Sequence, residues 1–185
     1  MERQRCPWAE SSELMRRYHD EEWGRPCHND AKLFEMLVLE GMQSGLSWSL
    51  ILNKREAMRE AFDGFDVSAI SMYDEPRLAQ LMETPGILHN RLKLASLPTN
   101  AKAFMAVQEE FETFDNYLWG FVNNTVIDNQ FTSQSELPAK TELAEAISKD
   151  MKKRGFKFMG PVVVYSLMQS IGMVNDHLVS CPCHE

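Results

Sequence analysis

The spacing of apolar residues is the feature that most constrains the fold of this chain. Apolar side chains recur three and four positions apart over most of its length, the period of one face of an α-helix. The strand-like run Val162–Tyr165 continues into Ser166-Leu167-Met168, which favours a buried helix. Residues 123–140 show no sustained period and are predicted to form a long surface loop. We predict an all-α fold with helices over residues 11–19, 30–44, 47–62, 74–84, 91–108, 114–122, 141–154 and 161–172.

Length and composition predict one compact unit, residues 1–185. A chain of 185 residues that is 44% hydrophobic can bury a sizeable core. It contains no uncharged apolar run of 18 residues, and its first residues lack the apolar core of a signal peptide. We therefore expect a soluble, cytoplasmic protein. In that compartment, four cysteines beside five histidines favour metal binding or free thiols over disulfides.

The net charge of −8 argues against a protein that holds nucleic acid by bulk electrostatic attraction. Basic residues do cluster locally, at positions 152–157 and 89–93, so a basic face can exist on the acidic protein. Such clusters are about as often plain solvated surface.

Glu40 is the first candidate for a functional side chain. It falls on the same helical face as Met36 and Leu37, whereas Glu35, one position off that stripe, is expected to reach water. A carboxylate on an apolar face needs a partner. That partner is either a backbone amide or arginine, which makes the acid structural, or a ligand.

Three aromatic residues favour the ligand. Trp48 follows the turn Gly45-Leu46-Ser47, and Tyr18 and Trp23 bracket an acidic bend. Buried aromatics are usually only core. Together with one acid they also form a box suited to a flat, cationic, hydrogen-bonding molecule.

The chain ends carry a possible metal site. Cys6 and His19 lie at one end, and His177 and Cys181 lie at the other. One helical turn between His177 and Cys181 would direct both at one ion, and four such ligands suit tetrahedral zinc. The spacing alone is weak evidence, because buried thiols and core histidines look the same. Competing ligands are Cys27, Cys183, His28, His89 and His184.

Residues 81–94 have the layout of a helix-hairpin-helix. An apolar helix end is followed by Pro85-Gly86-Ile87 and by a basic helix start with Arg91 and Lys93. In such a unit, backbone amides of the turn face a phosphate, which makes Gly86, Arg91 and Lys93 candidate DNA contacts. Any two helices joined by a short Pro-Gly turn would show the same pattern. No catalytic-triad order, phosphate-binding glycine loop or dinucleotide fingerprint is present, so those enzyme classes lose support.

The motifs taken together resemble the 3-methyladenine DNA glycosylase I group of the helix-hairpin-helix superfamily. They occur in the same order over essentially the whole chain. The matching segments are Cys6-Pro7-Trp8, Tyr18-His19-Asp20-Glu21-Glu22-Trp23-Gly24, Leu39-Glu40-Gly41, Ser44-Gly45-Leu46-Ser47-Trp48, Lys153-Arg154-Gly155-Phe156-Lys157-Phe158 and Val174-Asn175-Asp176-His177.

The resemblance implies a helical glycosylase of two lobes, with one structural zinc ion joining the termini. The implied zinc ligands are Cys6, His19, His177 and Cys181. The implied base pocket combines the catalytic-site acid Glu40 with Tyr18, Trp23 and Trp48. The chain departs from the expected pattern in three places: Met15 stands where an aromatic is expected, and Asn90 and Leu92 stand where a basic residue and a glycine are expected.

The expected substrate is double-stranded DNA that contains alkylated adenine. A purine alkylated on its ring carries positive charge, so its bond to deoxyribose is weak, and the enzyme must chiefly flip and select the base. Leu46, an apolar residue beside a flexible glycine, is a candidate wedge in the duplex, unless it is ordinary core at a helix start. Many helix-hairpin-helix glycosylases carry a catalytic Asp after the hairpin, and no Asp occurs between Leu92 and Phe114. With the resemblance, this absence implies a monofunctional enzyme that leaves an abasic site. The alternative is a catalytically inactive, zinc-stabilised DNA or nucleotide binding module, which the acidic charge and Met15 would favour.

Overall fold

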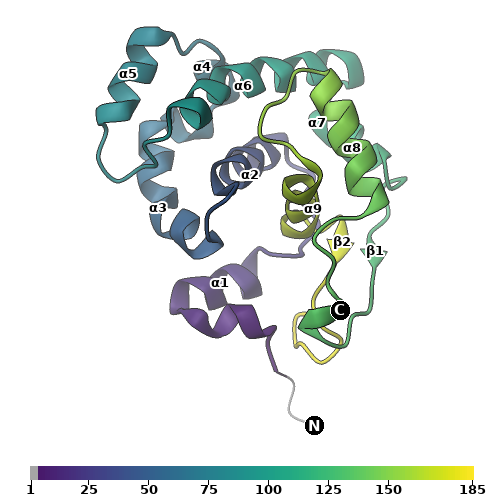
Figure 1. The fold of residues 1–185 in the computed structure, drawn as a ribbon. Coiled ribbons are helices and arrows are strands. Elements are labelled where there is room, and N and C mark those ends of the chain that lie inside the picture. The colour runs from purple at the N-terminus through teal and green to yellow at the C-terminus, as the bar shows by residue number, and fades with distance from the viewer. Residues whose placement is uncertain (1–3) are drawn as a thin grey trace.

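The computed structural model describes residues 4–185, a mostly helical chain (Figure 1). The first three residues of the expected 1–185 unit lie outside the described residues. Within residues 4–185 the 3-10 helices are η1 (Pro7–Ser11), η2 (Asp63–Phe65) and η3 (Gln134–Glu136), and the strands are β1 (Ile127–Asp128) and β2 (Val174–Asn175). The α-helices are α1 (Glu13–Glu21), α2 (Asp30–Gln43), α3 (Trp48–Ala61), α4 (Val67–Ser71), α5 (Glu75–Glu83), α6 (Arg91–Phe111), α7 (Phe114–Gly120), α8 (Glu142–Lys153) and α9 (Pro161–Ser170).

Each predicted helix is confirmed, with changes at two places. The segment predicted over 11–19 is divided, because Ser12 ends η1 in an extended conformation and its hydroxyl then caps α1 at the amide of Met15. Helix α4 is absent from the prediction. It is only five residues long, too short for an apolar period to show, and it is capped by Asp66.

The strands are a departure from a purely helical fold. Residues 127 and 128, which lie inside the segment predicted to be a loop, pair in parallel with residues 174 and 175. The cause lies in β2, which is buried and needs hydrogen-bond partners for its backbone. Two hydrogen bonds from the β1 segment supply these partners. The Ile127 amide donates to the Met173 carbonyl at 2.9 Å, and the Asn129 amide donates to the Asn175 carbonyl.

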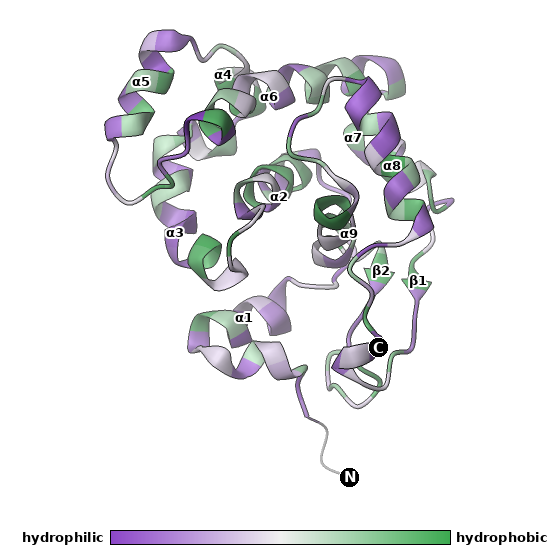
Figure 2. Cartoon of the chain, viewed as in Figure 1, coloured by the Kyte–Doolittle hydropathy of each residue, from purple (hydrophilic) through white to green (hydrophobic). Residues whose placement is uncertain are grey.

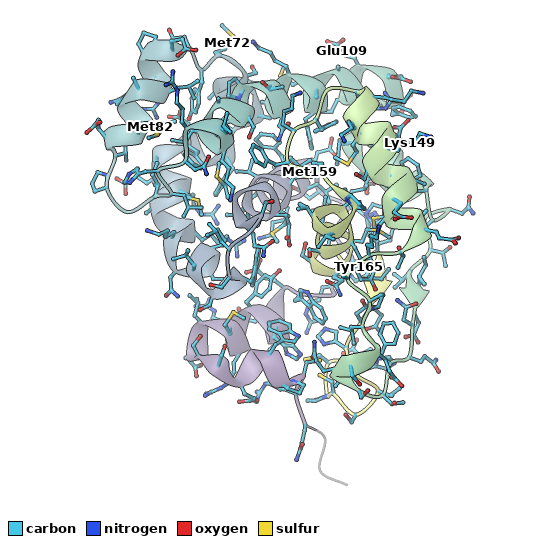
Figure 3. The ribbon with its side chains drawn as sticks, viewed as in Figure 1. Met72, Met82, Glu109, Lys149, Met159 and Tyr165 are labelled. Atoms are coloured by element: carbon cyan, nitrogen blue, oxygen red, sulfur yellow. The ribbon has the colours of Figure 1, made fainter. Side chains whose placement is uncertain are left out.

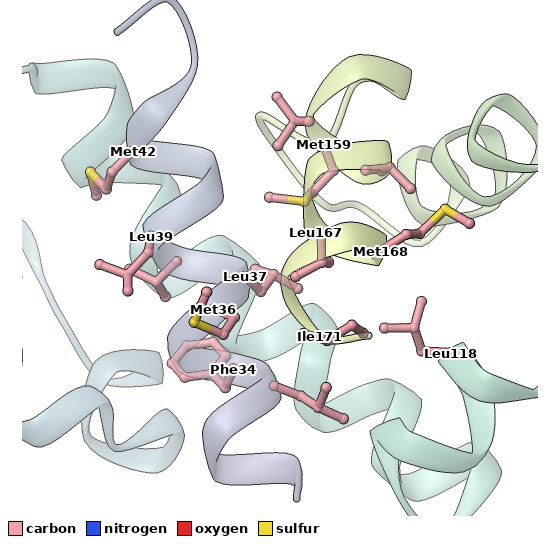
Figure 4. Packing of buried hydrophobic residues seen from close by; sticks show 14 of the residues in the cluster. Phe34, Met36, Leu37, Leu39, Met42, Leu118, Met159, Leu167, Met168 and Ile171 are labelled. Carbon is pink, nitrogen blue, oxygen red and sulfur yellow. The ribbon is translucent and has the colours of Figure 1, made fainter. Parts of the chain in front are cut away.

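Helix α2 lies at the centre of the molecule. Every residue from Leu33 to Met42 is buried, and α2 packs against α3, α6, α7 and α9. Figure 4 shows Leu37 of α2 beside Leu167 of α9. Both helices are largely apolar, whereas α8 at the rim carries hydrophilic positions on its outer side (Figure 2). The central position of α2 brings Glu40 into the interior.

Side chains fill the space between the helices. Met159 and Tyr165 lie in the interior, whereas Met72, Glu109 and Lys149 project at the rim (Figure 3). Among residues 4–185, no helix combines the length and the apolar character needed to cross a membrane.

The two ends of the described chain lie together. The Gln4 amide donates to the Ser180 carbonyl at 3.2 Å. The expectation of a helical turn between His177 and Cys181 is wrong: this segment is a tight turn closed by the Cys181 amide on the Leu178 carbonyl. The turn still directs both side chains to one point.

Candidate functional site

A cavity of about 250 Å³ lies where η1, α1, α2, α3 and α9 meet. The structure brings the predicted pocket residues Tyr18, Trp23, Glu40 and Trp48 together on its walls. The complete lining is Trp8, Met15, Tyr18, Trp23, Glu40, Gln43, Trp48, Gln134, Leu137, Ser166 and Gln169.

Four of the lining residues are aromatic. The rings of Tyr18 and Trp48 lie 5.3 Å apart, and those of Trp8 and Trp23 meet edge to face at 5.0 Å. Trp48 is the first residue of α3, where Ser47 fixes the helix start by accepting a hydrogen bond from the Leu50 amide. Within residues 4–185 the buried indole nitrogen of Trp48 has no hydrogen-bond partner, so a donor is available to a ligand.

Glu40 is the one carboxylic acid on the described cavity wall. It is only 3% exposed, and no basic side chain of the described residues lies within ion-pair distance. Burial raises the pKa of Glu40 to about 8, and the Ser170 side chain offsets part of that rise. The acid is therefore largely protonated near neutral pH. A cation entering the cavity would favour its ionised form.

An ion-pair network fixes the helices that carry these walls. Arg55 of α3 is 8% exposed and donates to Glu35 of α2 at 2.8 Å and to Glu22, just after α1, at 2.8 and 3.0 Å. Arg59 adds a second hydrogen bond to Glu35. The expectation that Glu35 reaches water is wrong, because α3 covers that side of α2 and supplies two guanidinium groups.

A second cluster joins the chain ends. One donor atom from each of Cys6, His19, His177 and Cys181 lies within 4.8 Å of the other three, and all four residues are buried. His177 Nδ1 lies 3.2 Å from His19 Nε2, 3.7 Å from Cys181 Sγ and 3.9 Å from Cys6 Sγ. A tetrahedral zinc ion with two nitrogen and two sulfur ligands needs donor separations of about 3.3 to 3.8 Å. The donor set therefore fits zinc.

Neighbouring groups orient the four side chains of this cluster. His177 Nε2 lies 2.9 Å from the Trp23 carbonyl and His19 Nδ1 lies 2.8 Å from Asp20, which leaves the other nitrogen of each ring facing the cluster. The Cys6 sulfur accepts the Leu178 amide, and the Cys181 sulfur accepts the Cys183 amide. Such contacts hold donor atoms in position around a metal ion. Gly24 makes room for it, since a Cβ there would meet the His177 ring at 2.8 Å.

The competing ligands lie elsewhere or farther away. Cys183 approaches His19 Nδ1 at 4.0 Å, on the side already occupied by Asp20. The ring of His28 instead contacts Asp115, and that of His89 contacts the Thr84 carbonyl. The structure thus brings together the four residues that the sequence singled out.

The predicted DNA contacts occupy two neighbouring loops. Gly45 and Leu46 lie in the turn between α2 and α3, where Gly45 has a φ of +78° and Leu46 is 36% exposed. Gly86 lies in the turn between α5 and α6, and Arg91 is exposed at the first turn of α6. Lys93 differs from the expectation: it is 6% exposed and its amine donates to the carbonyls of Met42 and Ser44. That geometry does not favour a phosphate contact by its side chain.

Comparison with known proteins identifies the family. Residues 8–184 match the methyladenine glycosylase family. The chain belongs to that family. The DNA-3-methyladenine glycosylase of Haemophilus influenzae is 44% identical, covering 97% of this chain and 97% of its own. DNA-3-methyladenine glycosylase 1 of Escherichia coli is 42% identical, covering 98% and 97%.

Solved structures agree. A crystal structure of 3-methyladenine DNA glycosylase I is 41% identical, with a TM-score of 0.95, and the match covers 98% of this chain and 100% of that one. The 3-methyladenine DNA glycosylase I of Staphylococcus aureus, solved to explain recognition of 3-methyladenine, has a TM-score of 0.96 at 33% identity and covers 100% and 98%.

Several wall residues of this methyladenine glycosylase family member escaped prediction. Ser166 and Gln169 are polar residues three positions apart in the largely apolar α9, and this spacing could have indicated that both face one site. Trp8 stood in a recognised motif without a role. Gln134 and Leu137 come from the irregular segment around η3, where the sequence has no period to read. Met15 does line the cavity, so the wall there is a flexible thioether instead of a ring.

Proposed function

We propose that this chain is a monofunctional DNA glycosylase of base excision repair that removes 3-methyladenine from double-stranded DNA. One observation carries the proposal: a buried acid with no basic partner in the described residues lies in an aromatic cavity beside an unpartnered indole N–H. Full-length relatives named DNA-3-methyladenine glycosylase support it.

The cavity suits a flat cationic base. Rings such as Tyr18 and Trp48 attract a cation through their faces. The Glu40 carboxyl, ionised by that cation, accepts hydrogen bonds from the exocyclic amine or a protonated ring nitrogen. Neutral adenine gains less from both contributions, so the cavity discriminates in favour of the alkylated base.

The reaction is hydrolysis of the bond between base and deoxyribose. The bonding electron pair leaves with the ring nitrogen and neutralises the base, while water adds its oxygen to the sugar carbon and releases a proton. Because the base is already a good leaving group, little acid catalysis is needed. No lysine lines the cavity among the described residues, which supports a product with an abasic site and an unbroken strand.

We propose that DNA is held by the α5–α6 hairpin and entered by the neighbouring turn. The turn and first amides of α6, with the exposed Arg91, would contact the phosphate backbone as a helix-hairpin-helix. Leu46 would fill the space left by the flipped nucleotide. Both loops lie next to the C-terminal end of α2, the helix that carries Glu40.

We further propose that one zinc ion is held by Cys6, His19, His177 and Cys181. All four positions of a tetrahedral site are then filled by protein, as in structural sites. The ion would supply cohesion between the chain ends and no reaction chemistry. Its ligands lie behind Trp23, outside the cavity lining.

The deciding experiment measures release of free 3-methyladenine from methylated duplex DNA, with intact abasic strands as the second product. Glu109→Gln, at an exposed acid far from the cavity, is the matched control for Glu40→Gln. We expect the parent and the control to release the base at equal rates. Binding of methylated DNA without any release would instead support the inactive binding module.

A further inference from the structure

Lys93 is a buried cation with an unusual environment. Its side chain is 6% exposed, and its Nζ atom donates to the carbonyl of Met42 at 2.8 Å and to that of Ser44 at 2.6 Å. No carboxylate of the described residues forms an ion pair with it. A buried lysine without an acid is costly and rare. The C-terminal end of α2 offsets part of the cost, because the partial negative charge of unpaired carbonyls gathers there.

The two carbonyls belong to the exit of α2. Helix α2 ends at Gln43, and the turn that follows is closed by the Leu46 amide on the Gln43 carbonyl and by the Gln43 side chain on the Leu46 carbonyl, each at 2.6 Å. Gly45 in this turn has a φ of +78° and open space around it. The turn therefore has few packing contacts of its own, and the Lys93 amine holds the backbone immediately before it.

Lys93 itself belongs to the hairpin. Asn90 caps α6 by accepting a hydrogen bond from the backbone amide of Lys93, two residues beyond the exposed Arg91. One residue thus has its backbone in the proposed phosphate-binding element and its amine on the turn that carries Leu46. A cation is suited to this task, since a single ammonium group can donate to both carbonyls at once.

We propose that Lys93 is a positioning residue that fixes the Gly45-Leu46 turn relative to the α5–α6 hairpin. This inference rests on the proposed function. When the hairpin binds the DNA backbone, Lys93 sets how far the Leu46 side chain lies from the hairpin as it enters the duplex. Lys93 therefore contributes to DNA repair by positioning Leu46, and its side chain does not bind a phosphate.

The test uses Lys93→Met, which keeps the apolar stem and removes the donors. The readouts are affinity for a duplex with an abasic-site analogue, single-turnover excision from methylated duplex, and affinity for free 3-methyladenine. We expect the first two to fall roughly ten- to hundredfold. Affinity for the free base should stay within about twofold, because Glu40 and the aromatic walls are untouched.

Two control variants separate positioning from charge. Arg91→Met removes an exposed cation of the hairpin and should lower the slope of log affinity against log salt by about one. Lys102→Met removes an exposed cation nine residues along α6, on the opposite side of the helix. It should change neither the affinity for the abasic duplex nor the salt slope. Lys93→Met should leave the salt slope at the parental value.

Coupling to Leu46 completes the test. If Lys93 acts through the wedge, the double variant Lys93→Met/Leu46→Ala should be no worse than Leu46→Ala alone. Additive losses, or a salt slope reduced as in Arg91→Met, would show a direct phosphate contact and overturn the proposal. A matching loss of free-base affinity would show a general packing defect and also overturn it.

Two further arms keep the result unambiguous. Lys93→Gln, which retains one donor group, replaces the methionine variant if that variant does not fold. A parent that binds the abasic duplex but releases no base contradicts the proposed excision and leaves the binding test of Lys93 intact. An active parent with an unaffected Lys93→Met contradicts the positioning role alone.

Discussion

His177 Nε2 lies 2.9 Å from the carbonyl oxygen of Trp23, and the two rings meet edge to face at 4.7 Å. His177 belongs to the four-ligand cluster, and Trp23 is a wall of the cavity. The two sites are therefore in direct contact, and His19 of the cluster adds ring contacts to Trp8 at 5.2 Å and to Trp23 at 6.1 Å. We expect order in the cluster to reach the cavity through both imidazoles.

Metal removal should lower stability strongly. Four buried donors without an ion lose the bonds that hold the chain ends, and each kcal/mol lost shifts the melting midpoint of a protein of this size by about 2 to 4 °C. We expect chelation, or Cys6→Ala, to lower the midpoint by roughly 10 °C or more. Metal analysis of protein purified without chelator should find about one equivalent of zinc.

Cys27→Ala is the matched control for this measurement. Its thiol is half-buried but lies outside the cluster, so the zinc content should not change. Less than about half an equivalent of zinc in the parent, or an unchanged midpoint in Cys6→Ala, would contradict a structural metal site.

Truncation of the proposed wedge should impair DNA engagement and spare the cavity. Leu46 is 36% exposed, so Leu46→Ala costs little packing in the free protein. We expect weaker binding of abasic duplex and slower excision, with unchanged affinity for free 3-methyladenine. Leu14→Ala, at a similarly exposed leucine on α1, is the control. Equal performance of parent and Leu46→Ala on both DNA measurements would show that Leu46 is ordinary surface.

Periodicity predicted the helices because most of them are long and bury one stripe. It failed for α4, which has five residues, and for β1, whose pairing partner lies 47 positions away at residue 174. Helix α2 shows a different limit. Its pattern indicated one apolar face, yet Glu35 is buried as well, because Arg55 and Arg59 of α3 neutralise it.

The candidate site was also only partly predictable from the sequence. Residue chemistry singled out Glu40 and the aromatic residues because an acid on an apolar face demands an explanation. The cluster ligands were ambiguous by spacing, and only the fold separates Cys181 from Cys183, through Asp20 on the far side of His19. Lys93 was misread because a basic residue at a helix start gives no sign of which way its amine points.

The pH dependence of stability should report the burial of Glu40. Its pKa rises from an ordinary 4.5 to about 8 in the folded protein. Between those values the folded state binds more protons than the unfolded state, so this group makes stability fall as pH rises through that window. Glu40→Gln stays neutral, so its stability relative to the parent should increase from pH 4.5 to pH 8 and then level off. A difference independent of pH in thermal or urea unfolding would show that Glu40 is ionised throughout.

The same variant, Glu40→Gln, also tests whether Glu40 recognises the alkylated base by its charge. Gln keeps the shape and one acceptor but cannot become the anion that pairs with a cationic purine. A charge-assisted hydrogen bond contributes roughly 1.5 to 3 kcal/mol, so single-turnover excision, in which the base is still cationic, should fall about ten- to two-hundredfold. Glu40→Ala should lose more, because it also leaves a cavity and unpaired neighbours.

Two other roles predict different results for folded Glu40→Gln. If Glu40 were a general base that activates water, Glu40→Gln would lose nearly all excision while free 3-methyladenine still bound normally. A purely structural acid would change the melting midpoint and leave binding per folded molecule intact. Tryptophan fluorescence can follow base binding, since Trp8, Trp23 and Trp48 line the cavity. Unchanged single-turnover excision in this variant would falsify recognition by charge, because that mechanism requires the anion while the cationic base is still joined to deoxyribose.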